Sequence, residues 1–203
     1  MDKTQNLAKQ YFSGLKEVVD KLDYDALGKL IDMIWGAYKR QTNIYFMGNG
    51  GSASIASHLA ADIGKNAMTD WSDNNEDRFR TLALTDNVAW MTALANDVGY
   101  ENVFVEQLKN LARKGDMVVV ISSGGNSPNV VKAAQWAKEH GLEVAAMVGF
   151  SGGKLKGIAD VSVWVPADNY GYVEGLHGDI HHYLVEALKE LKKQEKSEIK
   201  SSK

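Results

Sequence analysis

The residues best suited to chemistry lie in a loop rich in glycine and serine and in the helix predicted to follow it. The loop reads GNGGSAS over residues 48–54 and comes directly after the apolar segment 44–47, which predicts a buried strand. Glycines let the backbone approach an anion, serines donate from their hydroxyls, and a helix amino terminus adds free N–H groups and a positive dipole end. The unit therefore predicts a phosphate site that includes Asn49, Gly50 and Ser52.

His58 and Asp62 stand four residues apart in the predicted helix, so both side chains lie on one face. The last predicted helix carries a second group of imidazoles and carboxylates, namely Glu174, His177, Asp179, His181 and His182. Any one of these histidines can be structural. Taken with the neighbouring acidic residues, they predict either a divalent-metal site or a proton-transfer set.

Helical geometry leaves open which histidine of the last helix faces inward. Glu174, His177 and His181 stand at i, i+3 and i+7 and share a face, whereas His182 at i+8 lies on a neighbouring flank. The core face of this helix is predicted from its apolar positions, which are Leu176, Ile180, Leu184, Ala187 and Leu191.

A second loop repeats the design of the first. It reads SSGGNSP over residues 122–128 and follows the apolar segment 117–121, and its polar residues are Ser122, Ser123, Asn126 and Ser127. Taken singly, each loop can consist only of turn and cap residues. Two such loops after separate strands favour one shared anion site. Neither loop matches the patterns of ATP-binding or NAD-binding loops, so we expect neither ligand.

Composition limits the class of protein. The 203 residues suffice for one domain, and 44% hydrophobic and 24% charged residues are ordinary for a globular chain. A net charge of −3 gives no electrostatic case for nucleic acid as a partner. The chain has no cysteine, no apolar leader at its beginning and no run of about 20 apolar residues, so we expect a cytoplasmic protein without a membrane partner.

The predicted strands alternate with helices along the chain. They cover residues 43–47, 81–85, 117–121, 143–148 and 161–165, with a turn expected at 96–100. This alternation predicts an α/β three-layer sandwich with a central parallel sheet, which binds ligands beyond the carboxyl ends of its strands. Asp86 follows one of these ends, where it can bond a sugar hydroxyl or cap a helix.

Two helices are predicted before the first strand. The second, capped by Asp25, is apolar on more than one face, so we interpret residues 1–41 as a helical extension that packs against other subunits. The alternative is a helical hairpin that covers an edge of its own domain. We expect one domain over residues 1–194 and a charged tail over residues 195–203.

The motifs GNGGSAS with His58, NDVGY at residues 96–100 and SSGGNS at residues 122–127 resemble those of sugar isomerase (SIS) domain proteins. Within that family the chain is most similar to the phosphoheptose isomerases, which interconvert sedoheptulose 7-phosphate and a D-glycero-D-manno-heptose 7-phosphate. The resemblance covers nearly the whole chain. It implies a flavodoxin-like fold, a homotetramer with sites at subunit interfaces, and aldose–ketose isomerisation through an enediol(ate).

The resemblance also implies roles for particular residues. Ser122, Ser123 and Ser127, with Ser52, would grip the phosphate, and Asp62 and His182 would be the acid and base, in an order that the sequence does not give. Some members of the family hold zinc at the positions of His58, Asp62, Glu174 and His182, which implies a Zn²⁺ ion in each site.

Three positions depart from the family pattern. Asp62 is one methylene shorter than the usual glutamate, Gly124 replaces a hydroxyl residue of the phosphate loop, and Glu174 stands where glutamine is usual. The added carboxylate would strengthen binding of a divalent metal. Two other functions stay open: a related isomerase for a different sugar phosphate, and a non-catalytic SIS protein that binds sugar phosphates or associates with a replication initiator.

Overall fold

The computed structural model describes residues 2–201, except for the side chains of residues 199 and 200. Five parallel strands form one sheet in the order β2-β1-β3-β4-β5. The strands are β1 (Asn43–Met47), β2 (Arg80–Ala83), β3 (Met117–Ser122), β4 (Glu143–Val148) and β5 (Val161–Trp164). This is the flavodoxin-like strand order, so the predicted parallel α/β sandwich is confirmed.

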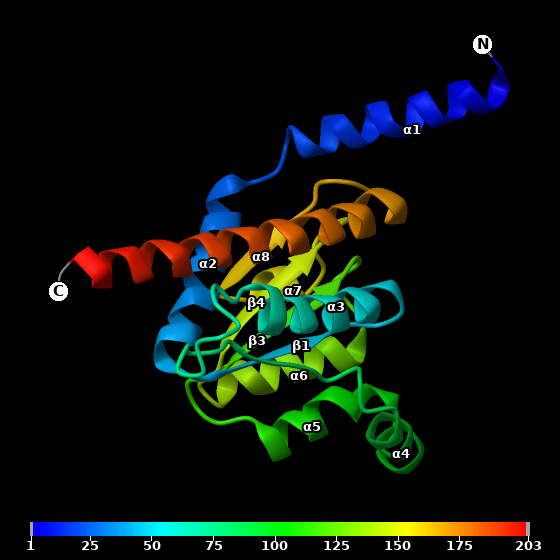
Figure 1. Cartoon of the computed structure of the whole chain (residues 1–203). Helices are drawn as coiled ribbons and strands as arrows, with labels where there is room; N and C mark the ends of the chain where they lie inside the picture. The colour runs from blue at the N-terminus through cyan, green and yellow to red at the C-terminus, as the bar shows by residue number, and fades with distance from the viewer. Residues whose placement is uncertain (1, 202–203) are drawn as a thin grey trace.

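Helices cover both faces of the sheet (Figure 1). They are α1 (Lys3–Val19), α2 (Tyr24–Arg40), α3 (Gly51–Asn66), α4 (Val88–Val98), η1 (Tyr100–Asn102), α5 (Val103–Leu111), α6 (Pro128–Glu139), α7 (Leu155–Ile158) and α8 (Tyr170–Ser201). Alternate residues of a strand point to opposite faces, so Val119 packs with α2, α3 and α8 while Val118 packs with α5 and α6. Among the described residues, no helix is long and apolar enough to cross a membrane.

The two amino-terminal helices differ in their packing. Helix α2 buries seven residues, including Leu30 and Ile34, against the sheet and α8 of its own chain, which is what the hairpin alternative requires of it. Helix α1 instead extends away from the body (Figure 1) and buries only Val18. Its contact with the body includes the ring of Tyr11, which lies 4.9 Å from the ring of Tyr172.

Several predicted boundaries shift in the structure. Strand β2 ends before 84–85 because the chain turns there toward α4, and α4 continues through residues 96–98, which we had expected to form a turn. The predicted cap of α2 was wrong, because the observed cap lies two residues earlier. Asp23, not Asp25, caps the helix by accepting a hydrogen bond from the Ala26 N–H at 3.1 Å.

Helix α8 is the longest element and runs along one face of the sheet (Figure 1). The apolar positions Leu176, Ile180 and Leu184 are buried as predicted. Residues 195–201, which we had assigned to a charged tail, belong to this helix, and residues 202–203 lie outside the described residues. The buried Lys192 holds the loop before β2 to α8, because its Nζ lies 2.7 Å from Oε1 of the buried Glu76.

Candidate functional site

A polar cavity of about 310 Å³ lies at the carboxyl ends of β1 and β3. Its lining residues are Asn49, Ser52, Ser122, Ser123, Gly124, Asn126, Ser127, Tyr170 and Glu174. The structure therefore brings both predicted serine loops to one cavity. The lining has no lysine or arginine, so a bound phosphate would be held by hydroxyls, amides and helix amino termini rather than by a cationic side chain.

Two serine hydroxyls of the second loop are free for a ligand. Ser127 is the N-cap residue of α6, yet its side chain makes no capping hydrogen bond. The Ser123 hydroxyl is buried and has no hydrogen-bond partner among the described residues. Since a buried hydroxyl without a partner is costly, Ser123 is best explained as a donor to a bound oxygen. Ser122 differs, because its Oγ accepts from the Gly125 N–H at 3.2 Å.

The second loop packs against Gly152 and Gly153, in the segment that follows β4. Gly125 has a left-handed φ of 65°, and a methyl group on it would overlap the backbone carbonyl of Gly152. Asn126 links the same two segments, because its Oδ1 accepts from the Lys154 N–H at 3.0 Å. Glycine is therefore required at residue 125 both for its backbone angle and for close packing.

The first loop is tied to the second by a pair of amides. Asn49 donates to Asn129 Oδ1 at 2.9 Å, and Asn129 donates back to Asn49 Oδ1 at 2.8 Å. The Tyr100 hydroxyl also donates to Asn49 Oδ1, at 2.9 Å. Asn49 thus lines the cavity while its amide fixes the spacing of the two loops. Gly50, predicted to bind substrate, is exposed and does not line the cavity; its φ of 54° turns the chain into α3.

Glu174 lies between the cavity and the start of α3. A methyl group on Gly51 would lie 2.7 Å from the Oε2 atom of Glu174, so the carboxylate lies directly against the backbone of Gly51. A carboxylate near a helix amino terminus is stabilised by the helix dipole. Glu174 therefore belongs with the serine loops. Tyr170, which sequence reasoning missed, also lines the cavity; its only signal was its position at the start of the last helix.

A second polar cluster forms farther along α3 and α8. Asp62 Oδ2 lies 3.2 Å from His58 Nε2 and 3.1 Å from His181 Nε2. Each of His58, His181 and His182 offers one ring nitrogen, and these nitrogens all lie within 4.8 Å of one another. Four of the predicted chemistry-bearing residues thus meet, although they come from two helices far apart in sequence.

His181 is the buried member of this cluster, while His58 and His182 are exposed. Burial is the largest cause of a lowered His181 pKa, and the neighbouring imidazoles His58 and His182 lower it further. The neutral ring that results at neutral pH can accept a proton or bind a metal. The Asp62 carboxylate also accepts from Asn66 Nδ2 through its other oxygen, at 2.9 Å, which fixes its orientation.

His177 does not join either group. It is fully buried, and neither ring nitrogen has a hydrogen-bond partner among the described residues. Burial lowers its pKa to about 4, against a smaller raising effect of the Val148 backbone, so the ring is neutral at physiological pH. The structure therefore separates the three histidines of α8: His181 and His182 face His58, and His177 is a core residue.

The serine cavity and the histidine cluster lie on the same pair of packed helices, α3 and α8. Both helices run in the same direction, because Glu174 meets Gly51 and His181 meets Asp62. Seven residues separate Glu174 from His181, which is about 10 Å along a helix. The histidines do not line the cavity in a single chain, so they form a separate group at this distance from it.

Two other features lie outside this arrangement. Asp86 does not line the cavity; its Oδ1 accepts from Ser57 on α3, and Asn87 rather than Asp86 caps α4.

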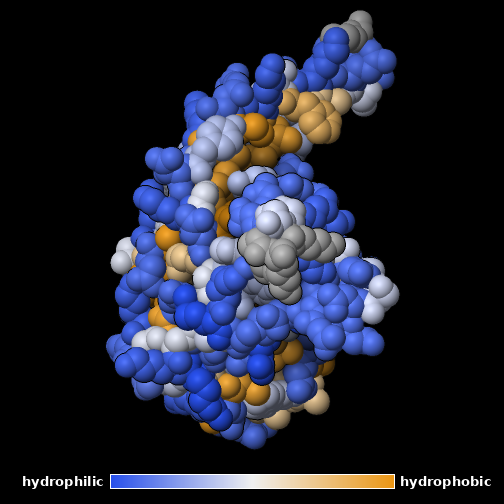
Figure 2. Space-filling view, turned by 60° about the vertical axis from the view of Figure 1, so that its left-hand side comes forward, coloured by the Kyte–Doolittle hydropathy of each residue, from blue (hydrophilic) through white to orange (hydrophobic). Residues whose placement is uncertain are grey.

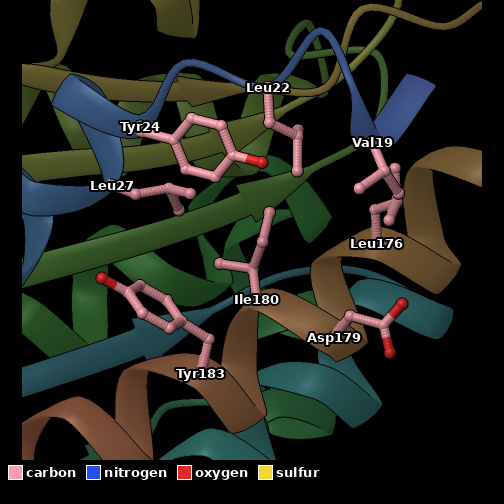
Figure 3. Close-up of a pocket in the computed structure, with 8 residues that line it drawn as sticks. All are labelled: Val19, Leu22, Tyr24, Leu27, Leu176, Asp179, Ile180 and Tyr183. Carbon is pink, nitrogen blue, oxygen red and sulfur yellow. The ribbon is translucent and has the colours of Figure 1, made fainter. Parts of the chain in front are cut away.

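A groove of about 330 Å³ lies between the end of α1, the start of α2 and α8 (Figure 3). Its lining is mostly apolar, with Asp179 as its one carboxylate, so it offers packing surface rather than chemistry.

A flavodoxin-like parallel sheet with a polar, serine-lined cavity at the carboxyl ends of its strands defines a class of ligand-binding α/β proteins. Comparison with known families is more specific: the family described as SIS domain matches residues 10–149. The chain belongs to the SIS domain family.

Relatives of known name cover nearly the whole chain. A phosphoheptose isomerase of Chlorobaculum parvum is 34% identical over 182 residues, which are 89% of this chain and 86% of the relative. A phosphoheptose isomerase of Helicobacter pylori is 33% identical over 186 residues, 90% of this chain and 94% of the relative. The solved phosphoheptose isomerase of Neisseria gonorrhoeae superposes with a TM-score of 0.83 at 27% identity, covering 93% of this chain and all of that one. The predicted family and subfamily are confirmed.

Proposed function

We propose that this protein is an aldose–ketose isomerase of a sugar phosphate, and that its substrate is sedoheptulose 7-phosphate. The observation that carries the proposal is the pairing of a serine-lined cavity with a histidine–carboxylate cluster about 10 Å farther along the same two helices. The relatives named phosphoheptose isomerase support the choice of substrate.

The substrate is long enough to reach from the serine cavity toward the cluster, whose His181 lies about 10 Å beyond Glu174 along α8. An extended chain advances about 1.2 Å per covalent bond, so the eight bonds from phosphorus to the first carbon of a heptose 7-phosphate span about 10 Å. A phosphate held by the serine loops would therefore place the reacting carbons near the cluster of His58, Asp62 and His182. Binding energy at the phosphate would then position the carbons for reaction.

At the phosphate end, the chain supplies neutral donors. Ser52, Ser122, Ser123 and Ser127 would donate to the phosphate oxygens, with N–H groups of the first turn of α6. Asn126 lines the same end, and Tyr170 and Glu174 would contact the sugar hydroxyls beyond the phosphate. Asp86 accepts a hydrogen bond from Ser57 of α3 and does not line this cavity, so we assign it no contact with the sugar.

At the reacting end, the cluster would move protons. Isomerisation removes a proton from the carbon next to the carbonyl and returns one to its neighbour, with a second group serving the oxygens. His182 and Asp62 are our candidates for these two tasks. Each positioned transfer typically contributes about 100- to 10,000-fold in rate.

The donor set of this cluster fits zinc. Asp62 Oδ2 lies 3.2 Å from His58 Nε2 and 3.1 Å from His181 Nε2, and ligands around a tetrahedral zinc with bonds of about 2.0–2.1 Å are spaced about 3.3 Å. His58, Asp62 and His182 would hold the ion, with Glu174 as the fourth ligand that the family resemblance implies. A bound zinc would polarise the sugar carbonyl.

The proposal is tested by incubating the zinc-loaded protein with sedoheptulose 7-phosphate and measuring the aldose product. Sugar-phosphate binding without turnover would instead support a non-catalytic binding protein.

A substitution in the cavity sharpens the test. Ser123→Ala is expected to raise KM about tenfold or more while leaving thermal stability unchanged or higher, because the hydroxyl has no protein partner to lose. Ser72→Ala, in the loop before β2, is the control and is expected to leave KM unchanged. Wild-type KM in a folded Ser123→Ala protein would contradict the assigned phosphate site.

We also propose that the chain acts as a homotetramer in the cytoplasm. Leu7 and Phe12 of α1 are 57% and 65% exposed, and apolar side chains gather where α1 leaves the body (Figure 2). Exposed apolar surface of this kind typically marks a protein interface. Sedimentation equilibrium measures the assembly, and a monomer at micromolar concentration would contradict it.

A further inference from the structure

Tyr170 is the only aromatic side chain among the described residues that line the serine cavity. It is the first residue of α8, and Glu174 follows four positions later, so the two cavity-lining side chains lie on the same face of the helix. Although it lines a cavity, Tyr170 is 62% exposed. Its ring therefore offers apolar surface to a ligand in the cavity.

Phe150 contacts the Tyr170 ring and limits its orientation. The two ring centroids lie 4.7 Å apart, with 55° between the ring planes. Phe150 is itself partly buried and packs against the apolar core that α8 shares with the sheet. Since aromatic rings at this separation attract one another, the exposed tyrosine ring has a preferred position beside the cavity.

The backbone of Phe150 adopts an angle that favours glycine. Its φ is 48°, which is costly for a bulky side chain. Two hydrogen bonds hold the residue there: its N–H donates to the Ala167 carbonyl at 3.0 Å, and its carbonyl accepts from Trp164 Nε1 at 2.8 Å. The preceding Gly149 N–H donates to the Ser123 carbonyl at 2.8 Å. The aromatic pair is thus attached to the segment that supports the phosphate loop, and the ring at residue 150 is explained by its contact with Tyr170.

The position of Tyr170 indicates which part of a substrate it meets. The eleven residues from Tyr170 to His181 span about 16 Å of α8, so Tyr170 lies at the end of the site away from the histidines. The face of an aromatic ring carries partial negative charge, which makes it a poor partner for a phosphate but a good one for C–H groups. The carbons within its reach are those next to the phosphate, not those at the carbonyl.

We propose that Tyr170 is a substrate-positioning residue whose ring packs on the carbons adjoining the phosphoester, and that Phe150 holds this ring in place. The inference rests on the proposed function, and it replaces a contact of Tyr170 with sugar hydroxyls by one with carbon. The ligand class is a phosphate ester of a hydroxylated carbon chain. Inorganic phosphate, which has no carbon, would use the serine loops alone.

Equilibrium dialysis of the full chain against sedoheptulose 7-phosphate, and separately against inorganic phosphate, measures both Kd values whether or not the sugar is turned over. Tyr170→Ala is expected to raise the Kd of the sugar phosphate by at least about fivefold, through the lost apolar contact, and to leave that of inorganic phosphate within about twofold. Tyr170→Phe retains the ring and is expected to bind both ligands like the wild type. The control is Tyr24→Ala, at an exposed tyrosine that is the first residue of α2, and it should also bind both like the wild type.

The role of Phe150 is tested by Phe150→Gly, which removes the ring while glycine retains the left-handed backbone angle. The Kd of the sugar phosphate is expected to rise about threefold or more, with that of inorganic phosphate within about twofold. The double variant with Tyr170→Ala should bind no more weakly than Tyr170→Ala alone, because both changes act through one ring. Circular dichroism checks folding, and if Phe150→Gly does not fold, the two Tyr170 variants decide.

An unchanged Kd of the sugar phosphate in Tyr170→Ala would overturn the proposal. Equal losses for the sugar phosphate and inorganic phosphate, or a Tyr170→Phe protein as weak as Tyr170→Ala, would do so too. Wild-type binding by Phe150→Gly, or additive losses in the double variant, would overturn the role of Phe150.

These outcomes are separate from those of the turnover assay. An active isomerase whose Tyr170→Ala variant binds like the wild type would refute the inference and leave the proposed function standing. A protein that binds the sugar phosphate through Tyr170 without turnover would do the reverse. No binding of the sugar phosphate by the wild type would overturn both.

Discussion

Acidification is expected to destabilise the protein through one buried imidazole, that of His177. Its pKa is lowered from 6.5 to about 4 because burial penalises the charged ring. Between these two values the unfolded chain binds a proton at this position and the native chain does not. Stability from this group is therefore fully present above pH 6.5 and falls as the pH falls toward 4.

The size of the effect follows from the two pKa values of His177. Each unit of difference corresponds to about 1.4 kcal/mol, so the full loss is about 3 kcal/mol below the native pKa and about 2 kcal/mol near pH 5. Replacing the ring by leucine removes the titration. It also removes two buried ring nitrogens that have no partner among the described residues, so the substitution should stabilise the protein at neutral pH too.

Urea denaturation of wild type and His177→Leu at about pH 7.5 and about pH 5, at one protein concentration, gives the free energies of unfolding. The wild type should lose about 2 kcal/mol more than the variant on acidification. His140→Ala, which removes an exposed histidine, should follow the wild type. Equal losses in wild type and His177→Leu would refute the reasoning.

Three further changes test the packing that positions the site, each by denaturation. Gly125→Ala should lower the free energy of unfolding by at least about 2 kcal/mol, through backbone strain and overlap. The control Gly28→Ala has open space around it and should raise the free energy of unfolding by about 0.5–1 kcal/mol. Equal stabilities of these two variants would contradict the reasoning. Lys192→Met should cost about 2 kcal/mol, because the buried Glu76 loses one of its two lysine partners and keeps only the more exposed Lys196. A smaller loss when Glu76→Gln is added would support the pairing. Asp23→Ala should cost about 1 kcal/mol through its lost cap; no change would show the cap to be dispensable.

Much of the site could be predicted from the sequence because its signals are local. The apolar segment 117–121 and the serine loop after it identify a strand end, whatever packs around them. Likewise, a spacing of four residues places His58 and Asp62 on one face of any α-helix. The fold class, the two serine loops and this pair were predicted for that reason, and the structure brings each loop to the same cavity.

The contacts between elements could not be read from local pattern. Asp25 and Asp23 are equally good caps by residue type, and only the path of the chain selected Asp23. The apolar faces of α2 predicted partners without identifying them, and the sheet and α8 of the same chain bury seven of its residues. In both cases the deciding neighbours lie outside the window in which periodicity is measured.

The sequence alone determined that the last helix carries imidazoles and a carboxylate at helical spacing. Only the tertiary structure decided where each of these side chains lies: Glu174 at the start of α3, His177 in the core and His181 beside Asp62. The reason is physical: spacing fixes which residues share a face of a helix. The rotation and height of α8 against α3 are set by packing between residues more than a hundred positions apart.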